Sequence, residues 1–192
     1  NCHLENLITT GTHLFAMGNT IKDINNTGML TNTGQQSQTL SLYGSMNNSG
    51  TIQSSGSFVL HLHAYGSIAN TGTFNPYTIQ FRGAEDRIFS CSPDHPIQAA
   101  GGITTEAGLG VIYINGQAWF AVMSYFSGPI TFRVFNLENQ AATLGFNNIT
   151  IANASIYGIS GSILNGNPMT LVTCYLEGLR LEGTIRCNNT CT

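Results

Sequence analysis

Two histidines one residue apart are the first candidates for chemistry in this sequence. His61 and His63 flank Leu62, so both imidazoles would lie on one face of a strand, where a third ligand from a neighbouring segment could complete a metal site. His3 is a further candidate, since an amino terminus followed by a histidine at position three can hold copper or nickel in a square plane. Solvent-facing histidines explain these positions more simply, so we predict no metal and no cofactor.

The acidic residues near the middle of the chain are the second candidates. Glu85, Asp86 and Asp94 form a cluster that Arg82 and Arg87 flank. Glycosidases use two opposed carboxylates, but neighbouring acids in a proline-containing segment are usually solvated turn residues. The sequence has no Gly-x-Ser-x-Gly motif and no phosphate-binding loop. We therefore predict that the protein is not an enzyme. An enzyme acting on polysaccharides at this cluster is the alternative.

The cysteines are many for a chain with so few charges. No Cys-x-x-Cys pair occurs, which disfavours a zinc site, and Cys187 and Cys191 are close in the sequence. We expect disulfide bonds in an oxidising compartment. Because the number of cysteines is odd, one remains for a bond between chains, and Cys2 is our first choice. The disulfide candidates are Cys2, Cys91, Cys174, Cys187 and Cys191.

Several asparagines lie in Asn-x-Ser/Thr sequences, the acceptor motif for N-linked glycans. Asn25 and Asn47 occupy equivalent positions in a repeat described below, where sugars would project outward. The glycosylation candidates are Asn25, Asn47, Asn148, Asn153 and Asn188.

Charged residues make up only 8% of the 192-residue chain, with six basic residues against nine acidic ones. Such a chain cannot form the basic patch that nucleic acids require, so no nucleic-acid partner is expected. The longest apolar stretch, near Ala118–Val122, is too short to cross a bilayer, and we expect no membrane span. The first residue is Asn1 and no signal peptide is present, which fits a mature secreted chain. We expect an extracellular or cell-surface location.

An internal repeat with a period of about 22 residues must position these side chains. Ile24–Gly28, Met46–Gly50 and Ile68–Gly72 share an apolar-x-Asn-Ser/Thr-Gly pattern. A second pattern, polar-apolar-x-apolar-x-Gly, has the period-two alternation that is typical of a strand with one buried face. This second pattern covers His13–Gly18, Thr39–Gly44, His61–Gly66 and Thr78–Gly83.

This repeat predicts an all-β fold, a parallel β-helix or solenoid with coils of about 22 residues. Alternate residues of each strand would stack on their equivalents one coil away in ladders, some facing inward and some outward. Glycine at each strand end would allow a positive-φ corner, and the asparagines would stack from coil to coil. If the period continued, Glu85 would lie above His63. The inward ladders are Leu14, Leu40, Leu62, Ile79 and Ala16, Leu42, Ala64, Phe81; the outward ladders are His13, Thr39, His61, Thr78 and Phe15, Ser41, His63, Gln80.

The tandem strand-and-turn pattern of residues 13–83, clearest in Leu62–Phe74, resembles the β-helix repeats of large secreted bacterial adhesins of the filamentous-haemagglutinin type. The resemblance implies a β-helix fold and secretion. It implies no catalytic residue, because the shared motif is structural.

The patterns divide the chain into three parts. Residues 1–83 would form solenoid coils with an amino-terminal extension. Residues 84–110, which hold acids, prolines and glycines, would form a loop or insertion. Residues 111–192 resume strand patterns, and Leu179–Ile185 repeats the earlier strand motif almost letter for letter. We expect this β-rich part to pack with the first as one unit. A sandwich-like portion after residue 97 is the alternative.

The ends of such a solenoid lead to a hypothesis for its function. Open ends carry unpaired strand edges, which solitary solenoids cover with a polar cap, and neither end of this sequence shows one. We expect a secreted structural subunit that assembles head to tail with copies of itself into an extracellular filament or matrix, through residues 1–15. The alternative is a surface adhesin or glycan-binding module of a longer protein, with Tyr43 and Tyr65 as an aromatic platform.

Overall fold

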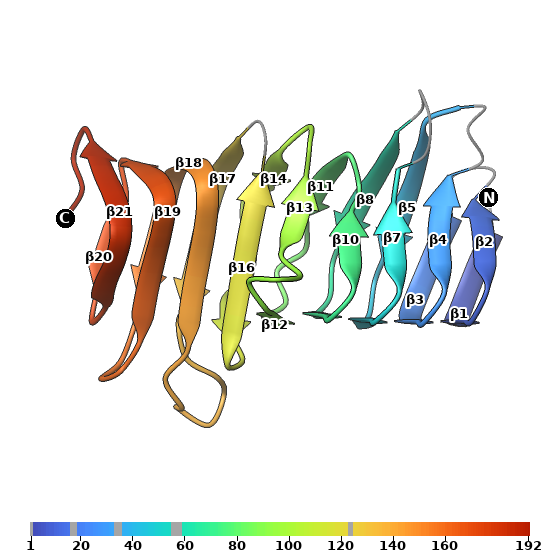
Figure 1. The fold of residues 1–192 in the computed structure, drawn as a ribbon, viewed down its shortest axis with the longest axis horizontal. Helices are drawn as coiled ribbons and strands as arrows, with labels where there is room; N and C mark the ends of the chain where they lie inside the picture. Colours follow the sequence, from blue (N-terminus) through green and yellow to red (C-terminus); the bar gives the residue numbers. More distant parts are fainter. Residues whose placement is uncertain (1, 16–18, 33–35, 55–58, 123–124) are drawn as a thin grey trace.

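The described chain is built from strands alone, wound into a parallel β-solenoid (Figure 1). The computed structural model describes residues 2–15, 19–32, 36–54, 59–122 and 125–192, without the side chains of residues 2, 3, 13–15 and 122. Successive coils stack along the long axis of the molecule, and the two ends of the chain lie at opposite ends of the stack. The predicted fold class, an all-β parallel solenoid, is confirmed.

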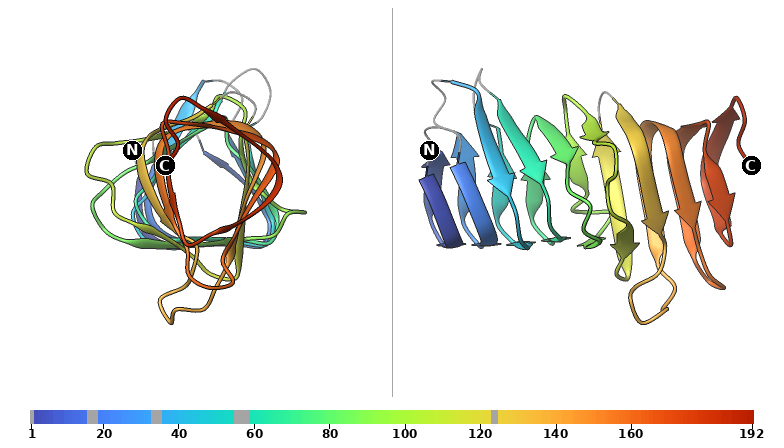
Figure 2. Two further views of the ribbon diagram at one scale, coloured as in Figure 1. Left: turned by 90° about the vertical axis from the view of Figure 1, so that its left-hand side faces the viewer. Right: turned by 180° about the vertical axis from the view of Figure 1, so that it is seen from behind.

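Three faces, here called A, B and C, form the wall of the solenoid, and a view down the axis shows its closed outline (Figure 2). Each strand pairs in parallel with its equivalent one coil away. Face A contains β5 (Gln38–Leu42), β8 (Leu60–Ala64), β11 (Thr78–Phe81) and β14 (Ile103–Thr105). Face B contains β6 (Met46–Asn48), β9 (Ile68–Asn70), β12 (Arg87–Cys91), β15 (Ile112–Ile114) and β20 (Tyr175–Glu177). Face C contains β2 (Thr12–Phe15), β4 (Met29–Asn32), β7 (Thr51–Gln53), β10 (Thr73–Asn75), β13 (Ile97–Ala99) and β16 (Gln117–Val122).

Longer strands pass a corner and contribute to more than one face. Three of them cross from face A to face B: β1 (Cys2–Thr9), β3 (Asn19–Asn26) and β17 (Phe126–Arg133). Two cross from face C to face A: β19 (Ile163–Val172) and β21 (Arg180–Asn188). The longest, β18 (Thr143–Tyr157), crosses all three. Since the strands after residue 97 continue the same three faces, the described residues form no sandwich.

The number of residues in a coil varies along the solenoid. In the early coils Asn26 pairs with Asn48, a step of 22 residues that matches the sequence repeat. Coils at both ends are shorter. Near the amino terminus the partners Thr9 and Asn26 are 17 residues apart. Near the carboxyl terminus the partners Asn165 and Glu182 are also 17 residues apart. The corners absorb these differences in length, because the strands must stay in register to pair.

The inward ladders of face A are confirmed from residue 40 onward. Their members are register partners and are at most 1% exposed: Leu40, Leu62 and Ile79 in one ladder, and Leu42, Ala64 and Phe81 in the other. The residues between them lie on the outer side of the wall. The hydrophobic alternation in the sequence therefore correctly predicts which side of these strands faces the core.

The first repeat lies on another face than its pattern predicts. Its strand β2 pairs with β4 on face C, so Leu14 is not a partner of Leu40. The residue beneath Leu40 on face A is Asn19 of β3, which is nearer to it in the sequence than Leu14 is. The predicted stacking of Leu14 on Leu40 and of His13 on Thr39 is therefore wrong. It would place more residues between the two stacked positions than this coil contains. Phe15 lies on β2 as well, and Ala16 falls outside the described residues.

Close packing between coils explains the glycines of the repeat. Gly28, Gly50 and Gly72 follow one another in the corner between faces B and C, and a Cβ atom at Gly50 would overlap the carbonyl oxygen of Gly28. A Cβ atom at Gly66 would overlap the coil below it in the same way. Gly66 does not lie in the left-handed region, so the predicted positive-φ corner is wrong there; Gly83 does have one, with φ of 89°.

Buried asparagines form a continuous ladder inside the first coils. Asn26, Asn48 and Asn70 are at most 2% exposed and stack one per coil. The Nδ2 group of Asn26 donates to Oδ1 of Asn48 at 2.6 Å, and that of Asn48 donates to Asn70 at 2.7 Å. Each amide also donates to a backbone carbonyl of the next coil, and Thr9 Oγ1 donates to Asn26. The predicted stacking of asparagines is confirmed, and it satisfies polar groups that are costly to bury unpaired.

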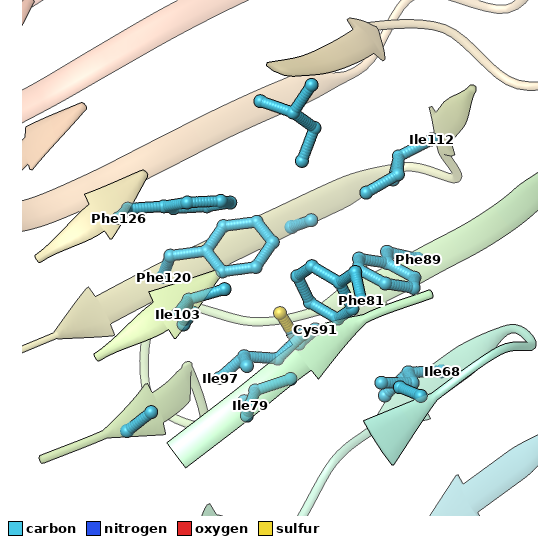
Figure 3. Packing of buried hydrophobic residues seen from close by; sticks show 14 of the residues in the cluster. Ile68, Ile79, Phe81, Phe89, Cys91, Ile97, Ile103, Ile112, Phe120 and Phe126 are labelled. Carbon is cyan, nitrogen blue, oxygen red and sulfur yellow. The ribbon is translucent and has the colours of Figure 1, made fainter. Parts of the chain in front are cut away.

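Phenylalanines fill the interior of the middle coils (Figure 3). Neighbouring rings lie 5.1–6.4 Å apart between centroids, mostly in the tilted and edge-to-face arrangements that aromatic quadrupoles favour, while Phe120 and Phe146 are stacked. Cys91 continues the asparagine ladder at its upper end, because it is the register partner of Asn70. The rings belong to Phe81, Phe89, Phe120, Phe126, Phe132 and Phe146.

Residues 84–110 contain β12, β13 and β14 and so take part in the solenoid. The expectation of a loop is wrong for these strands. Arg87 occupies an inward position, 1% exposed, and its guanidinium donates to the backbone carbonyls of Ala64, Gly83 and Glu85. A charged residue in an inward position conceals the alternation on which strand prediction depends. The division of the chain into separate parts stays a prediction.

Candidate functional site

The outward side chains of face A bring together several of the predicted site residues. His61 and His63 of β8 point away from the core, and Thr78 and Gln80 of β11 lie beside them in the next coil. The Nδ1 atom of His61 lies 2.7 Å from Oγ1 of Thr78. Gln80, and not Glu85, is the neighbour of His63, because this coil is shorter than the sequence repeat predicts.

The two histidines gain no third ligand from the described part of the chain. No group of three histidine, cysteine, aspartate or glutamate side chains there could hold a metal ion. Burial lowers the pKa of His63, and the positive charges of Arg82 and His61 lower it further. The side chain of His3 lies outside the described residues.

A ladder of Tyr43, Tyr65, Arg82 and Glu106, here called the tyrosine–arginine ladder, runs along one edge of face A. The two tyrosine rings stack with centroids 4.4 Å apart and an angle of 14° between their planes. Arg82 donates to the Tyr65 hydroxyl at 3.2 Å and lies 3.3 Å from a carboxylate oxygen of Glu106. The pKa of Tyr43 is raised mainly by a hydrogen bond to the Tyr65 hydroxyl. The charge of the Tyr65 hydroxyl group is the second cause.

This arrangement leaves little ring surface for a ligand. Each stacked tyrosine covers one face of its neighbour, and the Arg82 guanidinium lies 6.0 Å from the Tyr65 centroid on the other side. Tyr43 is 52% exposed and presents the outer face of the stack. A ligand that stacks on aromatic rings would therefore meet Tyr43 first.

Sequence reasoning identified the two tyrosines but missed their charged neighbours. Arg82 was within reach, since Tyr43, Tyr65 and Arg82 each precede the glycine of their repeat. Glu106 carries no such signal, because the next coil has a different length. Only the register of the folded strands places Glu106 beside Arg82.

A strand divides the acidic cluster. Glu85 and Asp86 precede β12 and Asp94 follows it, so a strand of about 16 Å separates them. All three are exposed. Oδ1 of Asp86 accepts a hydrogen bond from the backbone N–H of Val111 at 2.8 Å, which fixes a corner of the next coil. These carboxylates are not opposed across a shared site.

The four cysteines whose side chains are described are free thiols, so no disulfide joins them. Cys91 is 4% exposed, and burial raises its pKa to about 11, which makes it unreactive. Cys174, Cys187 and Cys191 lie at the carboxyl-terminal end, where Cys187 is the register partner of Leu171 and the Sγ atom of Cys191 lies 3.7 Å from the Leu171 carbonyl oxygen. Burial raises the pKa of Cys174. The side chain of Cys2 lies outside the described residues.

The five glycosylation candidates all have exposed side chains. Asn25 and Asn47 are neighbours on the outer side of face B. Asn148 and Asn153 lie in corners with left-handed backbone, at φ of 51° and 60°. The acceptor side chains are therefore accessible, and their glycosylation stays a prediction. The exposed acceptors are Asn25, Asn47, Asn148, Asn153 and Asn188.

The last strand exposes positions that are buried in the preceding coils. Leu144 and Leu164 are fully buried, whereas Leu181, the next member of their inward ladder, is 52% exposed. One edge of β21 pairs with β19, and no described strand pairs with its other edge. At the opposite end β1 pairs with β3 alone among the described strands. The carboxyl-terminal end thus presents both a strand edge and apolar surface.

No protein family, curated protein or solved structure matches this sequence. Within the residues that the structure covers, no helix is long and apolar enough to span a membrane. The structure shows the β-solenoid fold that the resemblance to filamentous-haemagglutinin-type repeats implied, and the resemblance to that family itself stays a prediction. The chain is a β-solenoid, and no family is assigned to it.

Proposed function

We propose that the protein is a secreted structural subunit that stacks end to end with copies of itself, forming an extracellular filament or matrix. The observation that carries the proposal is the exposure of Leu181, in a ladder whose earlier members are fully buried. A further coil placed against β21 would bury this side chain and pair the free strand edge.

The sizes of the terminal coils favour a second copy as the occupant. The step between paired strands is the same at both ends, from Thr9 to Asn26 and from Asn165 to Glu182; it is shorter than the step from Asn26 to Asn48 and equal to the step from His61 to Thr78 inside the solenoid. Similar coils have similar outlines, so on face A β1 of one copy could pair in parallel with β21 of another, and on face C β2 could pair with the part of β21 that holds Leu181. Since this contact joins two different surfaces, it does not close on itself and repeats into a fibre.

The composition of the chain supports assembly outside the cell. Charged residues are only 8% of the sequence, so little repulsion opposes the contact. The exposed glycan acceptors and the resemblance to secreted adhesins favour an extracellular location. Disulfide bonds belong to the same proposal, with Cys2 on β1 as the candidate for a bond between subunits.

A pair of matched substitutions tests the assembly. Leu181→Lys adds a charge at the proposed contact, and Leu137→Lys adds the same charge at a side chain that is 62% exposed in the loop between β17 and β18. Light scattering after gel filtration, over a range of concentrations, and electron microscopy should show oligomers and filaments for the unmodified chain and Leu137→Lys. Leu181→Lys should remain a folded monomer by circular dichroism.

Deletion of residues 1–12 should also give a folded monomer, because it removes the proposed pairing strand β1. The proposal is wrong if the unmodified chain stays monomeric at high concentration. It is also wrong if Leu181→Lys assembles as readily as Leu137→Lys.

A second function, glycan binding by a surface adhesin, is favoured by the tyrosine–arginine ladder. Tyr43 presents an open ring face, and the Arg82 and Glu106 side chains offer hydrogen-bonding groups nearby. A glycan array should then show binding that Tyr43→Ala abolishes and Tyr43→Phe retains in part. Equal binding by all three proteins, or no binding by any, would exclude this site.

A further inference from the structure

The segment after β21 begins another coil. Asn189 has a left-handed backbone, with φ of 64°, and turns the chain from face A towards face B. There the N–H of Leu176 donates to the carbonyl of Thr192 at 2.7 Å, and the N–H of Thr192 donates to the carbonyl of Cys174 at 3.2 Å. This alternation is that of a parallel strand pair, so Cys191 lies beside Cys174.

Cys174 and Cys191 occupy equivalent places in two successive coils. The Sγ atom of Cys174 lies 3.6 Å from the carbonyl oxygen of Ile151, and that of Cys191 lies 3.7 Å from the carbonyl oxygen of Leu171. Ile151 and Leu171 are register partners, so the two thiols are stacked in the same corner. Cys187 is the next member of the ladder above Leu171, and it brings a third thiol to this corner.

Cys187 and Cys191 both lie against Leu171. Cys187 is the register partner of Leu171, and the Sγ atom of Cys191 lies 3.7 Å from the Leu171 carbonyl oxygen. In keeping with this placement, the Cys191 thiol is the main cause that raises the pKa of Cys187, with smaller contributions from burial and Cys174. Cys187 is exposed and Cys191 is half-buried, whereas Cys174 is only 3% exposed. The exposed thiol is therefore open to a small reagent, and its partner lies within reach to complete a bond.

We propose that Cys187 and Cys191 are a redox pair that closes into a disulfide by exchange with a low-molecular-weight disulfide. The Cys187 thiol loses its proton to solvent, and the thiolate attacks one sulfur of the small disulfide, whose bond breaks to release one small thiolate. Cys191, deprotonated in turn, attacks the Cys187 sulfur and releases the second small thiolate. The protein loses two electrons and two protons, and the small disulfide is reduced to two thiols.

Closure would fix the corner that starts the new coil. The ring formed by the bond contains Asn189, whose left-handed backbone directs the chain onto β20. Holding this corner holds Thr192 against Leu176, and so protects the edge of β20. Oxidation would therefore order the carboxyl-terminal edge of the solenoid, independently of any assembly between chains.

Mass spectrometry of the full-length chain tests the pair. All proteins in this experiment carry Cys2→Ser, because the side chain of Cys2 lies outside the described residues and its thiol could form other bonds. The protein is equilibrated with reduced and oxidised glutathione at about pH 8.5, where thiolates are available, and free thiols are then alkylated. We expect the loss of two hydrogens, a link between Cys187 and Cys191, and alkylation of Cys91 and Cys174 only after denaturation.

Single substitutions distinguish this pair from its alternatives. Cys174→Ser should retain the bond. Cys187→Ser and Cys191→Ser should each lose it, and the remaining thiol should accumulate a mixed disulfide with glutathione. A link between Cys174 and Cys191, loss of the bond in Cys174→Ser, or no change in mass would each overturn the proposal.

Amide hydrogen exchange tests the consequence of closure. The N–H of Leu176 should exchange more slowly in the oxidised protein, because its acceptor Thr192 is held in place. The amide of Phe120, in the middle of the solenoid, should exchange at the same rate in both states. Equal exchange of Leu176 in both states would overturn the ordering of the edge.

Discussion

The early coils and the middle coils share one wall but differ in what fills it. In the early coils a ladder of amides runs through the interior, from Asn26 to Asn70, beside aliphatic side chains. In the middle coils packed phenylalanine rings such as Phe120 replace the amides. The ladder ends at Cys91, the partner of Asn70, which marks the boundary between the two interiors.

The difference explains why only one region shows a repeat in its sequence. An amide ladder needs the same residue at the same place in every coil, because each side chain bonds to its equivalent above and below. Packed rings need only volume and accept many relative orientations. The early coils therefore keep a constant step, from Asn26 to Asn48 and from Asn48 to Asn70, whereas the coil from Arg87 to Ile112 is longer.

A charge placed inside either region should have the largest effect. Leu62→Asp in the early coils and Phe120→Asp in the middle coils both bury an unpaired carboxylate, since both positions are at most 1% exposed. We expect each to lose more than about 4 kcal/mol of unfolding free energy and to prevent folding. Circular dichroism and urea titration measure this loss. Thr39→Asp, on the outer side of the wall, should be tolerated; equal loss there would mean that the two sides are assigned wrongly.

Truncation of an aromatic ring should have the next largest effect, confined to the middle coils. Phe120 packs against Phe89, Phe126, Phe132 and Phe146, so Phe120→Ala leaves a cavity that its neighbours cannot close. Such a change costs about 3–5 kcal/mol in a packed core. Phe120→Leu should cost clearly less, because it keeps most of the volume. A loss below about 1 kcal/mol for the alanine variant, measured by urea unfolding, would show that the rings are loosely packed.

Interruption of the amide ladder should cost less than removal of a ring. Asn48→Ala leaves the Nδ2 group of Asn26 and the Oδ1 atom of Asn70 buried without their partner. One such buried group costs about 1–3 kcal/mol. The matched control is Asn47→Ala, one residue away and exposed, which should change stability by less than about 0.5 kcal/mol. Equal unfolding midpoints for the two variants would show that the ladder contributes nothing.

The dependence of stability on pH should be the smallest effect. Burial, Arg82 and His61 lower the pKa of His63 in the folded protein below its ordinary value near 6.5, with Glu106 acting in the opposite direction. The unfolded chain then binds more protons, so the unfolding free energy should be fully present above pH 6.5 and fall as the pH drops through the folded pKa. His63→Gln should flatten this part of the profile. Thermal melts over a range of pH measure this dependence. If stability falls with pH as steeply in His63→Gln as in the unmodified protein, His63 is not the cause of the fall.

The sequence indicates the fold of the early coils well because their ladders are periodic. Leu40 and Leu62 alternate with polar neighbours, and the asparagines recur at a constant step, so strand faces and stacking could both be predicted. Prediction fails at β2 and at β12 for two different reasons. At β2 the hydrophobic alternation correctly predicts a strand, but the predicted number of residues between this strand and its neighbour in the next coil is too large. At β12 the inward Arg87 breaks the alternation itself.

The candidate sites show the same limit. The sequence names Tyr43, Tyr65 and the cysteines, since residue type alone marks them as aromatic or reactive. It does not place Glu106 beside Arg82, nor Cys191 beside Cys174. Those neighbours come from different coils. The number of residues between them in the sequence depends on the length of each corner, which the sequence pattern does not reveal.

By itself the sequence determined that the chain forms strands, which side of the early strands faces inward, and that asparagines stack. These properties depend on local alternation and on identical residues at a fixed step. Only the tertiary structure decided the lengths of the individual coils, the burial of Arg87, the exposure of Leu181 and the grouping of three thiols at one corner. The physical reason is that strand register is set by pairing along the whole wall, whereas the corners between strands can vary in length at little cost in free energy.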